Sequence, residues 1–132
     1  MRGLLLDTHV FLWWLADDPA LGLAARQEIA RTENLVFISA ATLWEIGIKK
    51  ALGKLEAPDH LSEVVEEERF LGLPVNLQHA ERVGVLPTHH RDPFDRMLVS
   101  QAQLEGLVLV TADRLLAAYA VEILVATNIG SW

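Results

Sequence analysis

The chain has 132 residues, a formal net charge of −7 at neutral pH and no cysteine. The acidic balance argues against broad, non-specific binding to nucleic acid, which normally needs a basic surface, but it leaves room for an enzyme that holds nucleic acid through metal ions. The absence of cysteine excludes disulfides, thiolate nucleophiles and zinc–thiolate sites.

Apolar residues make up 52% of the chain and charged residues only 22%. We therefore expect a partner or a second copy to cover some apolar surface. The apolar runs are too short to span a membrane, and the start of the chain lacks the long apolar region of a signal peptide. We expect a single domain over residues 1–132, located in the cytoplasm and without membrane contact.

Five short apolar segments predict β-strands, near residues 3–7, 35–39, 73–77, 107–111 and 122–126. The first, second and fourth are continuous apolar runs, which are typical of strands covered on both faces. Segments with helical patterns fill the gaps between them. This alternation predicts an α/β fold with a central parallel sheet of about five strands.

We expect helices after residue 8, from residue 19, over about 40–51, 60–71, 78–85 and 93–105, and briefly after residue 113. Asp18-Pro19 and Asp92-Pro93 are typical helix starts, with Asp as the N-cap and Pro at the first helical position. Ser39 is a plausible cap for the helix over 40–51. Trp44, Ile46 and Ile48 indicate that this helix packs closely on the sheet.

Four carboxylates lie at or near the ends of the expected strands. Asp7 ends the first strand, Asp113 follows the fourth, Asp95 opens the helix over 93–105, and Glu45 lies inside the helix over 40–51. Parallel strands present their carboxyl ends at one edge of the sheet, and acids gathered there repel one another. Such a cluster makes sense mainly around Mg²⁺ or Mn²⁺, because hard cations take oxygen ligands.

Each acid also has a purely structural explanation. Asp is common at strand ends and helix starts because it caps helices and interacts favourably with the helix dipole. Glu45 could form a simple surface ion pair with Lys49, four residues along the same helix. Of the two acids around Pro93, we assign the helix cap to Asp92 and the metal to Asp95.

Other polar residues lie close to these acids in sequence. The hydroxyls of Thr8, Ser39 and Thr111 could orient a carboxylate or could only cap helices. The five histidines are expected in loops and on helix surfaces, and we assign none of them a catalytic role. Six of the eleven basic residues could form a phosphate-binding rim or merely neutralise the acids: Lys49, Lys50, Lys54, Arg91, Arg96 and Arg114.

Taken together, these segments resemble PIN-domain proteins, specifically the VapC-like toxin ribonucleases of toxin–antitoxin pairs. The similarity lies in LLLDTHVFLWWL at 4–15, FISAATLWEIGIKKALGKL at 37–55, HHRDPFDRMLVSQAQLEGLVLVTAD at 89–113 and the closing EILVA. The resemblance implies a PIN-like three-layer α/β/α fold. It also implies that one or two divalent ions are bound by Asp7, Glu45, Asp95 and Asp113.

The same resemblance implies a function and partners. The chain would be a Mg²⁺- or Mn²⁺-dependent endoribonuclease that hydrolyses RNA phosphodiester bonds as the toxin of a pair. It would form a homodimer and bind a cognate antitoxin whose tail covers the site. Trp13 and Trp14 are candidates for antitoxin contact, or equally for the core or the dimer interface. The alternative left open is a non-catalytic PIN-type module that binds RNA or protein.

Overall fold

The computed structural model describes residues 2–128, and its centre is a five-stranded sheet in the order β3-β2-β1-β4-β5. Every neighbouring pair of strands is parallel, as predicted. β1 lies in the middle, so its carboxyl end is surrounded by those of its neighbours. The strands are β1 (Gly3–Leu6), β2 (Leu35–Ser39), β3 (Leu71–Leu73), β4 (Val108–Thr111) and β5 (Ile123–Val125).

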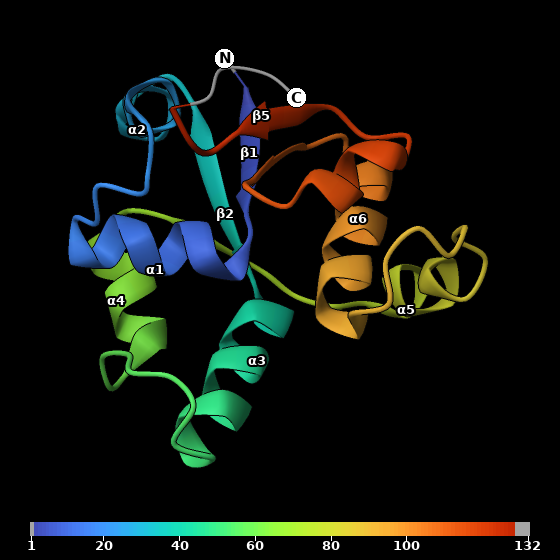
Figure 1. The fold of residues 1–132 in the computed structure, drawn as a ribbon, viewed down its shortest axis with the longest axis horizontal. Helices are drawn as coiled ribbons and strands as arrows, with labels where there is room; N and C mark the ends of the chain where they lie inside the picture. The colour runs from blue at the N-terminus through green and yellow to red at the C-terminus, as the bar shows by residue number, and fades with distance from the viewer. Residues whose placement is uncertain (1, 129–132) are drawn as a thin grey trace.

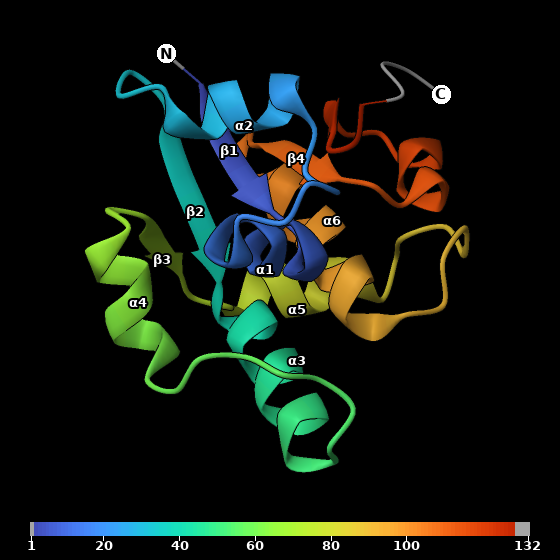
Figure 2. The ribbon, with the colours of Figure 1, turned by 60° about the vertical axis from the view of Figure 1, so that its left-hand side comes forward.

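Helices cover both faces of this sheet (Figures 1 and 2). They are α1 (Thr8–Ala16), α2 (Leu23–Ala30), α3 (Ala40–Ala51), α4 (Leu61–Glu67), α5 (Leu77–Val83), α6 (Pro93–Glu105) and a short 3₁₀ helix (Arg114–Ala118). Successive side chains of a strand point to opposite faces. Leu4 and Leu6 accordingly pack with α1 and α2, whereas Leu5 packs with α6 and the 3₁₀ helix. The molecule therefore has a helix–sheet–helix arrangement.

Two helices begin and end close to the expected residues because their caps are strong local signals. The Ser39 hydroxyl accepts a hydrogen bond from the Ala41 amide at the start of α3. Asp92 caps α6, with Pro93 in the first turn. Gly106 follows the last residue of α6 as its C-cap, and its φ of 66° lies in the left-handed region that favours glycine.

Three boundaries differ by several residues from the sequence-based expectation, and most of the others differ by one or two. The third strand is Leu71–Leu73 rather than 73–77, because Pro74 has no N–H to continue the ladder. α2 begins at Leu23 rather than at residue 19, since the Asp18 carboxylate binds the Ala20 amide in a turn instead of capping a helix. α4 ends at Glu67 rather than near residue 71, and Arg69 follows it with a φ of 62°.

α3 extends from the carboxyl end of β2 away from the sheet (Figure 2). Ile46 is buried, but Trp44 is 66% exposed and Ile48 is 38% exposed. The expectation that this helix packs closely on the sheet is supported by Ile46 but not by Trp44 or Ile48, because only one side of α3 faces the rest of the protein. Among residues 2–128, no helix combines the length and apolar character needed to cross a membrane.

Candidate functional site

Asp7 follows β1 directly and caps α1. One carboxylate oxygen accepts a hydrogen bond from the Val10 amide at 2.9 Å, and the other accepts one from the Thr111 hydroxyl. The side chain is buried, and this burial raises the pKa of Asp7 above its usual value despite both hydrogen bonds. Thr111 at the end of β4 therefore orients a carboxylate, one of its two expected roles.

Glu45 lies on the side of α3 that faces α1. Its Oε1 accepts the Thr8 hydroxyl at 2.6 Å, and its Oε2 pairs with Lys49 Nζ at 2.5 Å. The expected ion pair exists, but the Glu45 side chain is only 5% exposed, so it is not a simple surface pair. The hydrogen bond and charge of Glu45, together with the charges of Asp92 and Asp95, raise the pKa of Lys49.

Asp95 lies in the first turn of α6 and is half-buried. Burial is the largest cause that raises its pKa to about 7, and the charges of Asp92, Asp7 and Glu45 act in the same direction. Asp92 caps the helix as expected, since its Oδ1 accepts the amides of Phe94 and Asp95. The structure thus brings Asp95 within electrostatic reach of the other acids.

Asp113 follows β4 and caps the 3₁₀ helix, with the Leu115 amide bound to Oδ1 at 3.0 Å. Its own amide donates to Thr111 Oγ1, the hydroxyl that also binds Asp7. Its Oδ2 lies 2.6 Å from His90 Nε2. Asp7 and Asp113 are therefore linked through one threonine.

His90 is a component of this cluster that sequence reasoning missed. It lies in the loop before α6, and its Nε2 also approaches Asp95 Oδ2 at 3.3 Å. The available signal was its position two residues before Asp92. The expectation that the histidines lie in loops and on helix surfaces is wrong for His79, which is 1% exposed and contacts Glu105 through Nε2 at 2.9 Å.

Three of the six basic residues near the acids are engaged in contacts within the fold, and one of them is Lys49, which pairs with Glu45. Arg96 donates to the carbonyls of four residues and to the Tyr119 hydroxyl, with the carbonyl partners Val83, Leu86, Pro87 and His90. Lys50 pairs with Asp59. The expected phosphate-binding rim is therefore reduced to side chains that stay exposed, namely Lys54, Arg91 and Arg114.

The donor atoms of this cluster suit a hard cation. One ligand atom from each of His90, Asp95 and Asp113 lies within 4.8 Å of the other two. The Thr42 hydroxyl, one turn before Glu45 on α3, is buried and has no hydrogen-bond partner among residues 2–128. Carboxylate and hydroxyl oxygens are the ligands that Mg²⁺ and Mn²⁺ prefer. The described residues thus include a possible acidic metal site.

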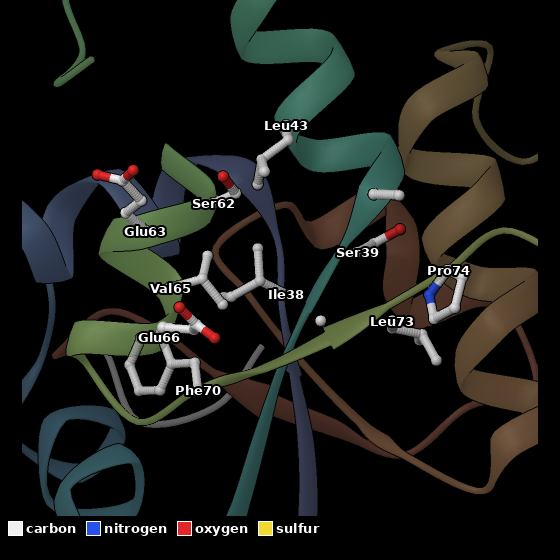
Figure 3. A pocket seen from close by; sticks show the side chains of 12 residues that line it. Ile38, Ser39, Leu43, Ser62, Glu63, Val65, Glu66, Phe70, Leu73 and Pro74 are labelled. Atoms are coloured by element: carbon white, nitrogen blue, oxygen red, sulfur yellow. The ribbon is translucent and has the colours of Figure 1, made fainter. Parts of the chain in front are cut away.

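A separate apolar groove of about 590 Å³ lies between α3, α4 and β3 (Figure 3). Leu43, Val65 and Phe70 line it, and Glu63 and Glu66 stand at its edge. None of the four predicted site acids lines it. The groove therefore has an apolar floor and an acidic margin, which differs chemically from the carboxylate cluster.

A family model for the PIN domain matches residues 4–122. The chain belongs to the PIN-domain family. Ribonuclease VapC22 of Mycobacterium tuberculosis is 30% identical to it over 123 residues, which cover 90% of this chain and 93% of that relative. The PIN-domain resemblance inferred from the sequence is confirmed.

Solved structures share the fold. VapBC2 from Rickettsia felis, bound to a promoter DNA fragment, superposes with a TM-score of 0.70 at 16% identity, over 93% of this chain and 98% of that one. DNA-bound VapBC from Salmonella typhimurium gives a TM-score of 0.66 at 24% identity, over 94% and 98%. These similarities confirm the expected PIN-like α/β/α fold.

Proposed function

We propose that this chain is a divalent-metal-dependent endoribonuclease that acts in the cytoplasm as the toxin of a toxin–antitoxin pair. The observation that supports this most directly is the convergence of Asp7, Glu45, Asp95 and Asp113 around the carboxyl ends of β1 and β4. The identity to a ribonuclease of the same family supports the reaction class. The similarity to VapBC structures supports the antitoxin.

We assign Asp7 and Asp95 as direct ligands of Mg²⁺ or Mn²⁺, with Glu45 and Asp113 completing the set or acting through water. A divalent cation held there would lower the pKa of a water molecule and stabilise the charge that develops on the phosphodiester oxygens. The raised pKa values of Asp7 and Asp95 fit this role, because carboxylates that are costly to ionise alone gain most from a cation.

The surrounding side chains fix the orientation of these carboxylates. Thr8 and Lys49 hold the two oxygens of Glu45, and Thr111 holds one oxygen of Asp7. Partners of this kind set the direction of metal-binding groups and influence affinity nearly as strongly as the ligands do. Arg91 and Arg114, which follow His90 and Asp113 in sequence, remain exposed and are our candidates for contact with RNA phosphates.

The test is cleavage of end-labelled transfer RNA by the purified chain in Mg²⁺, Mn²⁺ or EDTA. Wild type should yield discrete products with 5′-phosphate ends, and Asp95→Asn should yield none. Asp17→Asn is the matched control, since Asp17 is an exposed helix-end residue that pairs with Arg26, away from the cluster. Cyclic-phosphate ends, or cleavage that persists in EDTA, would exclude this mechanism.

The same experiment addresses the alternative function. If the folded wild type binds Mn²⁺ but leaves transfer, ribosomal and messenger RNA intact, the chain is a binding module rather than a nuclease. Retention of labelled RNA on the immobilised protein would then identify its ligand.

We propose that the groove between α3, α4 and β3 receives an antitoxin segment with apolar side chains and basic neighbours. The apolar floor formed by Leu43, Val65 and Phe70 suits the apolar side chains of such a segment (Figure 3). The exposed carboxylates of Glu63 and Glu66 suit its basic residues. Trp13 and Trp14 of α1 are partly buried against the core, which favours a role in core packing over contact with the antitoxin.

The antitoxin site is testable by charge reversal. Glu63→Lys with Glu66→Lys should prevent the co-expressed antitoxin from inhibiting RNA cleavage, while cleavage by the toxin alone stays unchanged. Glu33→Lys, an exposed acid before β2, serves as the control. Full inhibition of the double variant would exclude this groove as the antitoxin site.

We also propose a homodimer formed through the apolar surface that α3 shares with α5 and α6. This Trp44 surface consists of Trp44, Val75, Val83, Phe94 and Met97. Trp44 and Phe94 pack edge to face, with ring centroids 5.1 Å apart.

A further inference from the structure

His90 is held by both of its ring nitrogens. Nδ1 lies 3.0 Å from the Asp92 amide, which donates to it. Nε2 lies between two carboxylates, 2.6 Å from Asp113 Oδ2 and 3.3 Å from Asp95 Oδ2. The ring therefore connects the backbone of the α6 cap with two acids of the site.

The amide of Asp92 determines which ring nitrogen carries the proton. A backbone amide can only donate, so Nδ1 must offer its lone pair and cannot carry a hydrogen itself. In the neutral ring the proton then lies on Nε2, which becomes a donor directed at Asp113 and Asp95.

We propose that His90 is a positioning residue of the metal site, a fixed N–H donor to Asp113 and Asp95 rather than a metal ligand. This inference rests on the proposed function. To bind a cation, Nε2 would need the lone pair that its proton occupies. Moving the proton to Nδ1 would direct that hydrogen at the hydrogen of the Asp92 amide. The geometry thus favours His90 as a hydrogen-bond donor to the two carboxylates and disfavours it as a ligand of the metal.

The backbone around His90 is held equally firmly. The His90 amide donates to the hydroxyl of Tyr119, a buried residue, at 3.0 Å. Arg96 binds the same hydroxyl and, with its other contacts, holds carbonyls along the loop from Val83 to His90. A donor held on a rigid frame keeps its direction without further ordering when a cation arrives.

This arrangement has a consequence for Asp113. Its Oδ1 is bound by the Leu115 amide and its Oδ2 by His90, so both oxygens have fixed directions while each keeps a further lone pair. The donor also lies between Asp113 and Asp95 and offsets part of their mutual repulsion. Loss of His90 should therefore weaken cation binding without removing a ligand.

The experiment measures Mn²⁺ binding by calorimetry at about pH 8 for wild type, His90→Ala, His90→Gln and His89→Ala. The alanine variant at position 90 should lose about 10–100-fold in affinity, the usual effect of removing such a partner. Gln places an N–H donor near the position of Nε2, so it should recover most of the affinity. His89 is exposed, its ring packs against that of Tyr119, and it has no ion pair with a carboxylate among residues 2–128, so His89→Ala should bind like wild type.

The outcomes separate this inference from the proposed function. If wild type binds no Mn²⁺, the proposed metal site fails, and the role of His90 fails with it. If wild type and His90→Ala bind equally, only the role of His90 fails. Equal losses in both His90 variants, with a nitrogen coupling in the electron paramagnetic resonance spectrum of bound Mn²⁺, would make His90 a ligand and overturn the proposal.

A measurement on metal-free wild type keeps the inference testable even if the variants fold poorly. Long-range ¹H–¹⁵N correlation spectra should show Nε2 protonated and Nδ1 unprotonated in His90. A proton on Nδ1 would contradict the tautomer and overturn the proposal.

Discussion

Asp95 carries much of the electrostatic cost of gathering acids at one edge of the sheet. Its pKa of about 7 reflects burial and the charges of Asp92, Asp7 and Glu45, which His90 only partly offsets. Because the pKa is raised in the folded state, folded protein retains a proton on Asp95 between about pH 4 and 7 that unfolded protein has released. The free energy of unfolding therefore falls as the pH rises through this window.

Asp95→Asn should remove this cost. In metal-free buffer at about pH 8, the variant should unfold at higher urea than wild type, with a free-energy gain on the order of 2–4 kcal/mol. The gain should shrink as the pH falls toward about 4, where the wild-type carboxyl is also neutral. A variant less stable than wild type at both pH values would mean that Asp95 contributes mainly as a favourable first-turn charge of α6.

Cation binding should release protons from the same group. Near pH 6 the carboxyl of Asp95 is mostly protonated, so each bound Mn²⁺ should displace up to one proton from it. Affinity should rise by up to about tenfold per pH unit below 7 and level off above it. Calorimetry in buffers of different ionisation enthalpy counts the protons. A release that does not change between about pH 6 and 8 would contradict the assignment of Asp95 as a ligand.

At the scale of elements, Arg96 joins α6 to the loop that presents His90. Its guanidinium donates to carbonyls at both ends of that loop and to Tyr119. Arg96→Lys keeps the charge but replaces the planar fork with a single point donor, which cannot reach these acceptors together. We expect a loss of about 1.5–3 kcal/mol in the free energy of unfolding and faster amide hydrogen exchange over residues 85–92. Arg91→Lys, at an exposed neighbour, should change stability by no more than about 0.5 kcal/mol.

Elements with strong local signals could be predicted from the sequence. Ser39 and Asp92-Pro93 specify the starts of α3 and α6 through contacts within a few residues, and both helices begin where expected. Asp18-Pro19 carries the same helix-start signal but forms a turn. The choice between these outcomes depends on tertiary packing, which a local pattern does not contain.

The residues of the candidate site also fall into two groups, those that the sequence predicts and those that depend on tertiary structure. The positions of Asp7 and Asp113 follow from strand ends, so a parallel sheet predicts that they lie at the same edge, and the pairing of β1 with β4 brings them together. His90 contacts an acid 23 residues away, and that contact depends on a loop held by Arg96 and Tyr119. A pattern of residue types does not encode how such a loop is directed. The sequence offered only the position of His90 two residues before Asp92, and its contact with Asp113 is visible only in the structure.

At the scale of the whole molecule, α3 has two different sides. Glu45 lies on its buried side and belongs to the acidic cluster, while the adjacent Trp44 is 66% exposed. In the Trp44 surface, apolar side chains from α5, α6 and the segment before α5 surround the indole. An exposed apolar patch of this kind often marks a protein interface, and buried tryptophans are frequent sources of its binding energy.

Trp44→Ser should therefore convert a dimer into a monomer. Loss of a central tryptophan typically costs 2 kcal/mol or more, which raises the dissociation constant by about 30-fold or more. Sedimentation at protein concentrations around the wild-type dissociation constant measures this change. Leu23→Ser removes a comparably exposed apolar side chain on α2, outside the Trp44 surface, and should leave the dimer intact. A wild type that stays monomeric at high concentration, or a Trp44→Ser dimer of unchanged affinity, would contradict the proposed interface.

The thermal unfolding of Trp44→Ser should stay close to that of wild-type monomer, because the indole is mostly in solvent within one chain.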